Sequence, residues 1–348
     1  SNLWIVYYPF KHLQQMDNIL SKGSISNFPS NFHRNHGKSI FPDKTAEIIF
    51  KFSVLHLQNR AFEGKLSFEY FLTGERFMAN DTSRVKALII TGVGLNCEKE
   101  TAAAFTSAGA TAEQVHLNDL LNGKRSLSEF HILAFIGGFS FGDHLGSGTV
   151  FANRLKFRLH DELLEFVKAG KLIIGICNGF QTLTRLGLAP ALDGKYFEQQ
   201  AALTHNDCGV FRDDWVTLTV NADSPCVFTR GLKVFRLPIR HGEGKFVAEE
   251  SVLQRIEKEN LVVLRYCAPD GSPAKGFPQN PNGALNDIAG ICDSTGRIFG
   301  LMPHPEAFLS PFNAPDWQTK KLEGKLPEWG EGKVIFDNAV KFAAENLL

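Results

Sequence analysis

The chain lacks paired cysteines, an excess of charge of one sign and a long apolar run. None of its six cysteines forms a C-x-x-C pair, which argues against a zinc site and a small disulfide scaffold and favours a reducing cytoplasm. Basic and acidic residues both number 37, so nothing indicates nucleic acid or an anionic membrane as partner. The longest apolar runs are strand-sized, and no secretory signal pattern opens the chain. A cytoplasmic globular protein is expected.

Nucleotide-binding signatures are also missing. No G-x-x-x-x-G-K-[ST] loop occurs. Gly92-x-Gly94-x-x-Cys97 resembles a dinucleotide fingerprint, but the third glycine is absent and no acidic residue follows at the usual distance. We interpret it as a tight strand-to-helix turn and predict no cofactor on this chain.

Two parts of the chain differ in composition and in hydrophobic periodicity. Residues 1–83 are rich in Phe, Asn, Ser and His, with helical spacing only around 10–20 and 45–57, and no chemistry is recognisable there. This N-terminal extension fits a linker, a docking segment or a non-native stretch equally well. Residues 84–348 are expected to form the functional domain.

Strands alternate with helices after residue 84, which predicts an α/β fold with a parallel, doubly wound sheet that binds ligands at the carboxyl ends of its strands. The expected strands are 85–91, 111–116, 131–136 and 171–176, and the expected helices are 98–108, 154–169 and 333–346. After Pro190 the pattern changes to short strands with turns, which predicts added β-hairpins; these strands are 216–220, 234–238, 245–248, 262–266, 288–292 and 298–301.

One cysteine lies where a nucleophile is expected. The apolar run KLIIGI predicts a buried strand, and helical spacing begins after Gly179. Cys177 lies between them, and Gly175 and Gly179 leave room for a sharp turn and for an approaching substrate. A thiolate at a helix N-terminus is also stabilised by the helix dipole. A buried core cysteine is the alternative, but the paired glycines favour a nucleophile.

A cysteine hydrolase also needs a base and an acid that orients the base. His304 and Glu306 lie two residues apart between prolines, and in extended backbone both side chains point to the same side. Glu306 is therefore expected to hold the His304 ring toward Cys177. Taken alone, the two residues would suit a solvated loop; their combination with the Cys177 turn favours a triad.

Amide donors for an oxyanion are expected at two turns. The N–H of Asn178 directly follows the nucleophile, and the Gly137-Gly138 turn ends a neighbouring strand. Glycine allows a backbone N–H to point inward, so Gly138 is the second candidate donor.

These residues resemble those of the class I (triad) glutamine amidotransferases. Further stretches are similar to the glutaminase subunits and domains of phosphoribosylformylglycinamidine synthases: GGFSFGD from Gly137, PIRHGEGKF from Pro238, NPNG from Asn280 and GLMPHPE from Gly300. The resemblance covers about residues 84–348.

The resemblance implies a flavodoxin-like fold and a glutamine-dependent step of purine biosynthesis. Cys177 would attack the side-chain amide of L-glutamine to form a γ-glutamyl thioester, with His304 and Glu306 completing the triad. The released ammonia would pass to a synthetase partner, which carries ATP and Mg²⁺ and converts formylglycinamide ribonucleotide to the amidine. A small third subunit is a further partner that the family suggests.

The resemblance also suggests substrate contacts. Gln181, four residues after the nucleophile, occupies a position that contacts glutamine in the larger group. Asn206 is the candidate for the α-amino or α-carboxyl group. His241 and Glu243 form a His-x-Glu loop with too few ligands for a metal site, so they are expected near the glutamine pocket or the partner interface. Gly137 completes the predicted substrate-binding set, and no metal is expected.

Three alternatives stay open. A triad amidotransferase of another pathway would differ in its ammonia acceptor. A non-catalytic regulatory relative would have lost a triad member, whereas all three are present. A cysteine peptidase or another thiol hydrolase on a similar sheet would lack Gln181 and the Pro-His-Pro-Glu segment.

Overall fold

The computed structural model describes residues 81–348, and the helices expected around 10–20 and 45–57 lie outside this part. Its main sheet has the strand order β2-β1-β3-β4-β11-β10-β9-β6-β7. These strands are β1 (Lys86–Thr91), β2 (Thr111–His116), β3 (Ile132–Phe135), β4 (Leu172–Ile176), β6 (Arg212–Val220), β7 (Val234–His241), β9 (Val262–Cys267), β10 (Ile288–Cys292) and β11 (Ile298–Leu301). The first five strands of this order pair in parallel, and the other four pair antiparallel. The α/β, mostly parallel fold with helices around it is thus confirmed.

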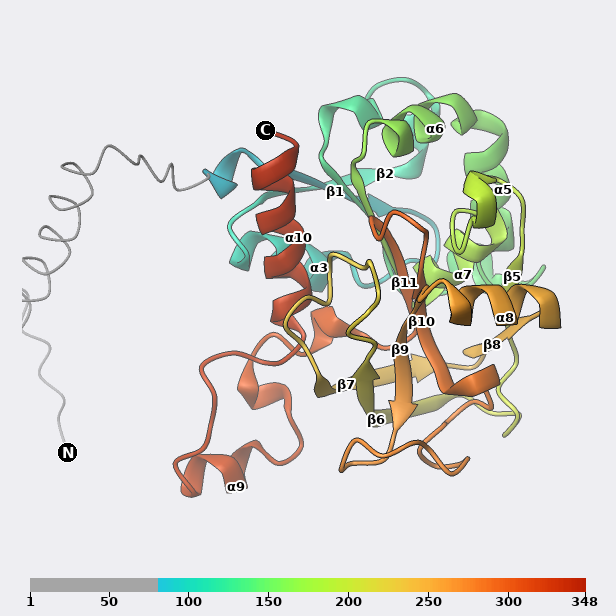
Figure 1. Ribbon diagram of the computed structural model, residues 1–348. Coiled ribbons are helices and arrows are strands. Elements are labelled where there is room, and N and C mark those ends of the chain that lie inside the picture. Colours follow the sequence, from blue (N-terminus) through green and yellow to red (C-terminus); the bar gives the residue numbers. More distant parts are fainter. Residues whose placement is uncertain (1–80) are drawn as a thin grey trace, which may run out of the picture. The chain divides into compact units, whose positions relative to one another are not determined.

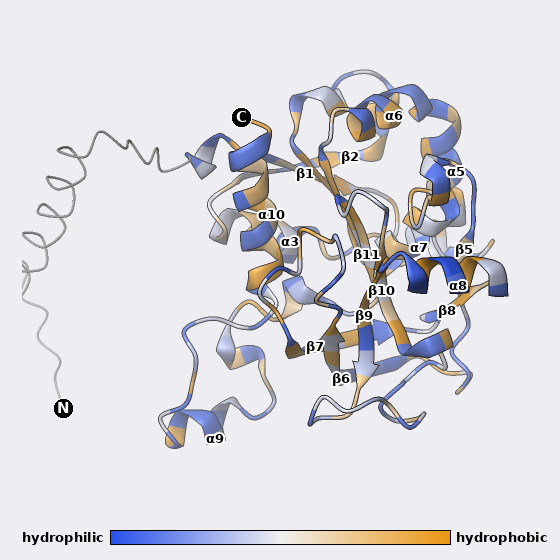
Figure 2. Cartoon of the chain, viewed as in Figure 1, coloured by the Kyte–Doolittle hydropathy of each residue, from blue (hydrophilic) through white to orange (hydrophobic). Residues whose placement is uncertain are grey.

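Helices cover both faces of the parallel half of the sheet (Figure 1). The helices of the described chain are α3 (Glu98–Ser107), α4 (Leu117–Leu121), α5 (Thr149–Arg158), α6 (His160–Lys168), α7 (Asn178–Leu186), α8 (Glu250–Lys258), α9 (Trp317–Leu322) and α10 (Lys333–Asn346). Alternate residues of β1 point to opposite faces, so Ile89 packs with Phe105 and Phe336 of α3 and α10, whereas Leu88 belongs to the cluster of α5 and α6. Figure 2 shows the resulting apolar colouring of the central strands.

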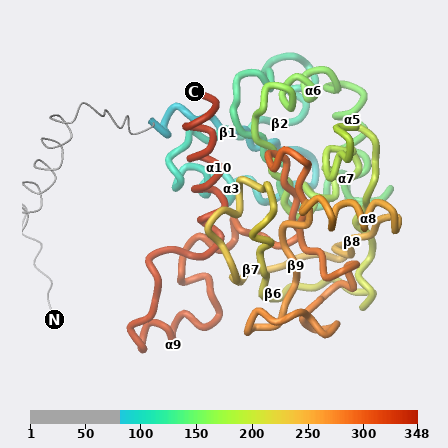
Figure 3. The backbone as a smooth tube through the Cα atoms, viewed as in Figure 1, coloured from blue at the N-terminus to red at the C-terminus, as the bar shows by residue number. Residues whose placement is uncertain are grey.

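The ends of the described chain come together. Helix α10 packs against α3 and against η1 (Thr82–Arg84), a 3₁₀ turn capped by the Asp81 side chain (Figure 3). Phe105 and Phe336 meet edge to face with their ring centroids 5.0 Å apart. The last helix therefore closes the domain on the strand that starts it. No helix within residues 81–348 is long and apolar enough to cross a membrane.

One expected helix differs from the structure, and one observed helix was not expected. The single helix predicted over 154–169 is wrong: two helices, α5 and α6, replace it, and the break lies at Leu159, whose φ of −130° and ψ of 20° are not helical. Helix α8 was not expected among the hairpins, although Leu253 and Ile256 bury one face of it at helical spacing.

The antiparallel half confirms the expected hairpins and extends the sheet. Strands β6 and β7 form one hairpin, and β10 and β11 form another. Strand β8 (Lys245–Ala248) instead pairs with β5 (Ala201–Thr204) in a small separate sheet. The β10–β11 hairpin brings β11 back beside β4 in parallel, so the segments that follow these two strands meet at one edge of the sheet.

Candidate active site

Cys177 occupies a strained turn between β4 and α7. Its backbone has φ of 53° and ψ of −108°, a region that residues other than glycine rarely adopt. A Cβ on Gly179 would lie 2.0 Å from the Phe135 carbonyl oxygen, and one on Gly175 would lie 2.7 Å from the Gly179 oxygen. Both glycines are therefore required by close packing, and the turn presents the thiol at the carboxyl end of the sheet, as the sequence indicated.

His304 and Glu306 form a buried pair beside this turn. His304 has extended backbone, whereas Glu306 lies in the 3₁₀ turn η6 (Pro305–Ala307) that His304 caps; the predicted contact is present, with His304 Nδ1 2.6 Å from Glu306 Oε1. Their side chains are only 3% and 1% exposed. The His304 amide donates to the Pro238 carbonyl at 2.8 Å, which ties the segment to β7. The ring is thus fixed in place by both its backbone and its acid partner.

The environment of His304 favours the charged ring. Burial opposes ionisation, but the negative charge of Glu306 and the Cys177 thiol outweigh it and hold the pKa of His304 well above its ordinary value. The Cys177 Sγ lies 3.4 Å from the Arg240 carbonyl oxygen, an acceptor that keeps the thiol at the pocket wall. A pocket of about 250 Å³ opens over Cys177, His304, Gly138 and Phe139.

The two residues expected to supply oxyanion donors, Asn178 and Gly138, lie on different elements beside Cys177. Asn178 is the first residue of α7, where the amide has no carbonyl of an earlier turn to bond. Gly138 has φ of 139°, and its neighbours are pinned to the β1–α3 turn: Asn96 N donates to Gly137 O, and Phe139 N donates to Gly94 O. The arrangement can supply two donors to a developing negative charge.

A smaller pocket adjoins the larger one at Cys177, and hydrogen-bonded amide side chains lie beside it. The Asn178 side chain donates to Asp143 Oδ1 at 3.2 Å and to Gln181 Oε1 at 2.9 Å. Gln181 in turn donates to the Glu243 carbonyl at 2.6 Å. Burial raises the pKa of the Asp143 carboxyl. Two carboxylates line this pocket, those of Asp143 and Glu243.

Asn206 and His241 support the wall of this smaller pocket. The Asn206 side chain donates to the Val210 and His241 carbonyls and accepts from the His241 ring and from the Gly244 amide. All of its hydrogen-bonding capacity is therefore used inside the protein. Burial, with a contribution from the charge of His304, lowers the pKa of His241 to about 3, so its ring is neutral at physiological pH.

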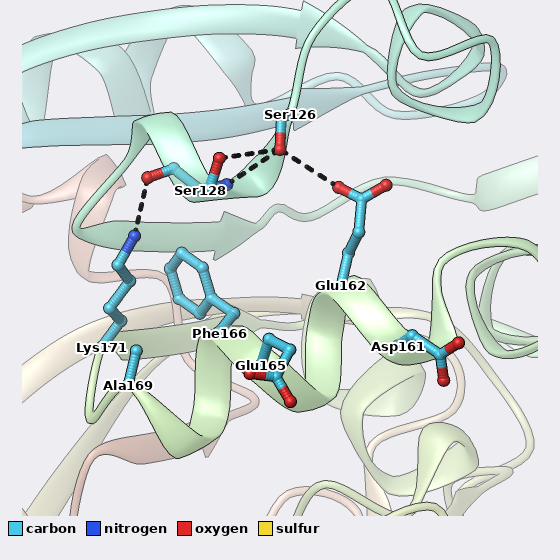
Figure 4. A pocket seen from close by; sticks show the side chains of 8 residues that line it. All are labelled: Ser126, Ser128, Asp161, Glu162, Glu165, Phe166, Ala169 and Lys171. Atoms are coloured by element: carbon cyan, nitrogen blue, oxygen red, sulfur yellow. Dashed lines mark hydrogen bonds between the residues drawn. The ribbon is translucent and has the colours of Figure 1, made fainter.

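Another hollow lies at the amino end of β4, away from this edge of the sheet (Figure 4). Lys171 donates to the Ser128 carbonyl at 2.9 Å, and Ser126 lies 3.4 Å from Glu162 Oε2. Phe166 forms its apolar side, with the Lys171 ammonium 5.0 Å from its ring centroid. These contacts join α6 to η2 (Leu127–Glu129).

Three residues of the site were missed by the sequence reasoning. Asp143 and Arg240 lie within the motifs already noted, but only the folded chain shows that they contact Asn178 and Cys177. Cys97, assigned to a simple turn, lies beside His304 and lines the same pocket as Cys177. No local pattern marks these contacts, because each joins segments far apart in the chain.

Residues 84–343 match the family model of the CobB/CobQ-like glutamine amidotransferase domain. Among curated proteins, the phosphoribosylformylglycinamidine synthase subunit PurQ of Methanococcus maripaludis is 48% identical over 74% of this chain and 97% of its own length. The corresponding subunit of Dehalococcoides mccartyi is 44% identical over 76% and 99%.

A solved structure agrees with these relatives. In the structure described as PurLQS from Thermotoga maritima, one chain is 30% identical, with a TM-score of 0.55 over 74% of this chain and 99% of its own. The predicted family resemblance is confirmed: this chain is a class I glutamine amidotransferase and belongs to the family of the PurQ subunits of phosphoribosylformylglycinamidine synthase.

Proposed function

We propose that this chain hydrolyses L-glutamine as the glutaminase component of a phosphoribosylformylglycinamidine synthase. The observation that carries the proposal is the strained Cys177 turn beside the buried His304–Glu306 pair. A thiol, a base and an acid in this relation suit acyl transfer from an amide.

The mechanism follows from the position of each group. The Cys177 thiolate attacks the side-chain amide carbon of glutamine, and the oxyanion accepts hydrogen bonds from the Gly138 and Asn178 amides. The His304 imidazolium gives its proton to the departing nitrogen, and ammonia leaves behind a γ-glutamyl thioester. Neutral His304 then takes a proton from water, which hydrolyses the thioester to glutamate and returns the thiolate. Glu306 stabilises the charged ring in both halves.

Substrate recognition is proposed for the smaller pocket. The Asp143 and Glu243 carboxylates suit the α-ammonium group of glutamine, and the Gly137 segment forms the facing wall. Gln181 and Asn206 were predicted as direct ligands. Because their amides are already bonded to protein groups, we propose that they instead hold the Glu243 and His241 loop in position.

A synthetase partner is proposed for the mouth of the larger pocket. The exposed rings of Phe139 and Phe211 line it with their centroids 6.1 Å apart, and Val93 beside them is 59% exposed. An apolar rim suits a protein partner that receives ammonia without loss to water. The PurLQS description indicates such assemblies among relatives, and a third small subunit fits the same proposal.

Nucleotide chemistry with ATP and Mg²⁺ is assigned to the partner. All six cysteines are unpaired, in keeping with the proposed reducing cytoplasm.

Affinity labelling tests the assignment directly. A glutamine-analogue electrophile, diazo-oxo-norleucine, is expected to modify Cys177, as mapped by mass spectrometry, and the label is expected to be lost in Cys177→Ala. Cys208→Ser removes an exposed cysteine and is the matched control, with labelling unchanged. With the synthetase partner, Cys177→Ala should lose glutamine-dependent synthesis but keep synthesis from free ammonia. Labelling elsewhere, or glutamine-dependent synthesis that survives in Cys177→Ala, would contradict the proposal.

A further inference from the structure

A second cysteine lies against the catalytic pair. Cys97 precedes α3, and one ligand atom each from Cys97, His304 and Glu306 lies within 4.8 Å of the other two. Its thiol lies 3.4 Å from Asn96 Oδ1 and is also hydrogen-bonded to the His304 ring. Unlike the buried cysteines at 226, 267 and 292, Cys97 is partly exposed and lines the pocket that opens over Cys177. A solute in that pocket can therefore reach it.

Gly137 lies against both the Cys97 sulfur and the His304 ring. A Cβ placed on this glycine would be 3.0 Å from Cys97 Sγ, 2.8 Å from His304 Cε1 and 3.5 Å from His304 Nδ1. Because both side chains approach the same point of this glycine, the sulfur and the ring lie close to one another.

One buried polar atom of the cluster, Glu306 Oε2, lacks a hydrogen-bond partner within the described residues, on a side chain that is 1% exposed. His304 Nδ1 lies 2.6 Å from Glu306 Oε1, so Nδ1 is the ring nitrogen that can share an ion with Glu306. Sulfur, imidazole nitrogen and carboxylate oxygen are the ligand types that zinc takes in proteins. Donors around such an ion lie roughly 3.5 Å apart, so small side-chain rotations suffice to gather the three groups.

We propose that a thiophilic divalent cation such as Zn²⁺ binds Cys97, His304 and Glu306 and blocks the site reversibly. On binding, the cation replaces the thiol proton of Cys97, which passes to solvent. The His304 ring and Glu306 are then no longer free to serve Cys177. The catalytic reaction itself uses no metal in this scheme; the ion is an inhibitor. Inhibition by the cation rests on the proposed glutaminase function, whereas binding of the cation to the three side chains does not.

Cadmium binding tests the site without any activity. Thiolate coordination of Cd²⁺ gives an ultraviolet charge-transfer band, which is titrated in the full chain carrying Cys177→Ala and Cys208→Ser. These changes remove the nucleophile and the exposed cysteine but keep the proposed ligands. The band is expected to saturate at one Cd²⁺ ion per chain. When Cys97→Ser is added, the Cd²⁺ concentration at half saturation should rise at least tenfold. Cys97→Ala serves as a second variant of the same ligand.

Inhibition by Zn²⁺ is measured separately on the chain with Cys177 intact. The Zn²⁺ concentration for half inhibition should rise at least tenfold in Cys97→Ser. The reference for each variant is its own glutaminase rate in the presence of a chelator. Adding the chelator after Zn²⁺ should restore that rate. A cadmium band that is absent, or unchanged by Cys97→Ser and Cys97→Ala, overturns the proposal. A normal band in a chain without glutaminase activity supports the metal site and rejects the proposed function.

Discussion

The carboxylate of Glu306 favours the charged form of His304, the proposed catalytic base. We expect Glu306→Gln to bring the pKa of His304 down from its raised value, because the amide keeps the shape of the side chain and removes the negative charge. The rate constant kcat should fall roughly 100-fold or more, since the imidazolium formed during the reaction loses its partner. NMR titration of the ring and steady-state kinetics measure both effects.

Glu100→Gln is the matched control for this change. Glu100 lines the same pocket but is exposed, so the same loss of charge should leave the pKa of His304 nearly unaltered. A His304 pKa that stays raised in Glu306→Gln would show that another group stabilises the ring.

The buried neutral ring of His241 predicts a loss of stability in acid. Its pKa is about 3 in the folded protein and 6.5 in the unfolded chain, so between these values the unfolded state binds more protons. The free energy of unfolding should therefore fall as pH drops below 6.5, by about 1.4 kcal/mol per pH unit from this group.

Urea unfolding at several pH values measures the slope. His241→Gln should flatten it, whereas His205→Gln, at a side chain that is 82% exposed, should not. An unchanged slope in His241→Gln would assign the acid sensitivity to other groups.

Among the elements, the turn between β4 and α7 allows the least change. A methyl group on Gly179 would lie 2.0 Å from the Phe135 carbonyl oxygen, which is fixed in the sheet. Gly179→Ala is therefore expected to lower the free energy of unfolding by about 3 kcal/mol, as overpacking does. At Gly92 the nearest atom would be 3.5 Å away, an ordinary contact, so Gly92→Ala should change stability by only about 0.5 kcal/mol. Thermal unfolding that shifts equally in both variants would reject this explanation.

The elements that the sequence predicted are those with strong local patterns. The apolar run before Cys177 and the helical spacing after it are both local, so β4, the turn and α7 could be located without the structure. The break at Leu159 could not, because no glycine or proline marks it and it results from packing. The same distinction holds in the site, since the contacts of Cys97, Asp143 and Arg240 depend on how distant segments pack.

At the scale of the whole molecule, residues 84–348 were expected to be a domain, and that division stays a prediction. The described contacts suggest a start a few residues earlier: Asp81 caps η1, and Thr111 Oγ1 donates to the Ser83 carbonyl at 3.1 Å. A chain of residues 81–348 is expected to unfold in one cooperative transition in urea. A chain of 84–348 should be less stable by about 1 kcal/mol, the usual effect of losing a cap. Failure of the longer chain to fold alone would show that the domain needs residues before 81.

The pairing of β11 with β4 has a consequence for how a partner can control the reaction. Cys177 N donates to Leu301 O at 2.8 Å, so the proposed nucleophile and the segment carrying the proposed base are joined in the middle of the sheet. Separating them requires near-global opening, and amide hydrogens there should exchange slowest. The segment after Gly138, by contrast, contains left-handed residues at Phe141, Gly142 and Asp143. A partner that controls the reaction is therefore expected to reorient the backbone amide of the proposed oxyanion donor Gly138. The distance between the Cys177 thiol and the His304 imidazole should stay constant.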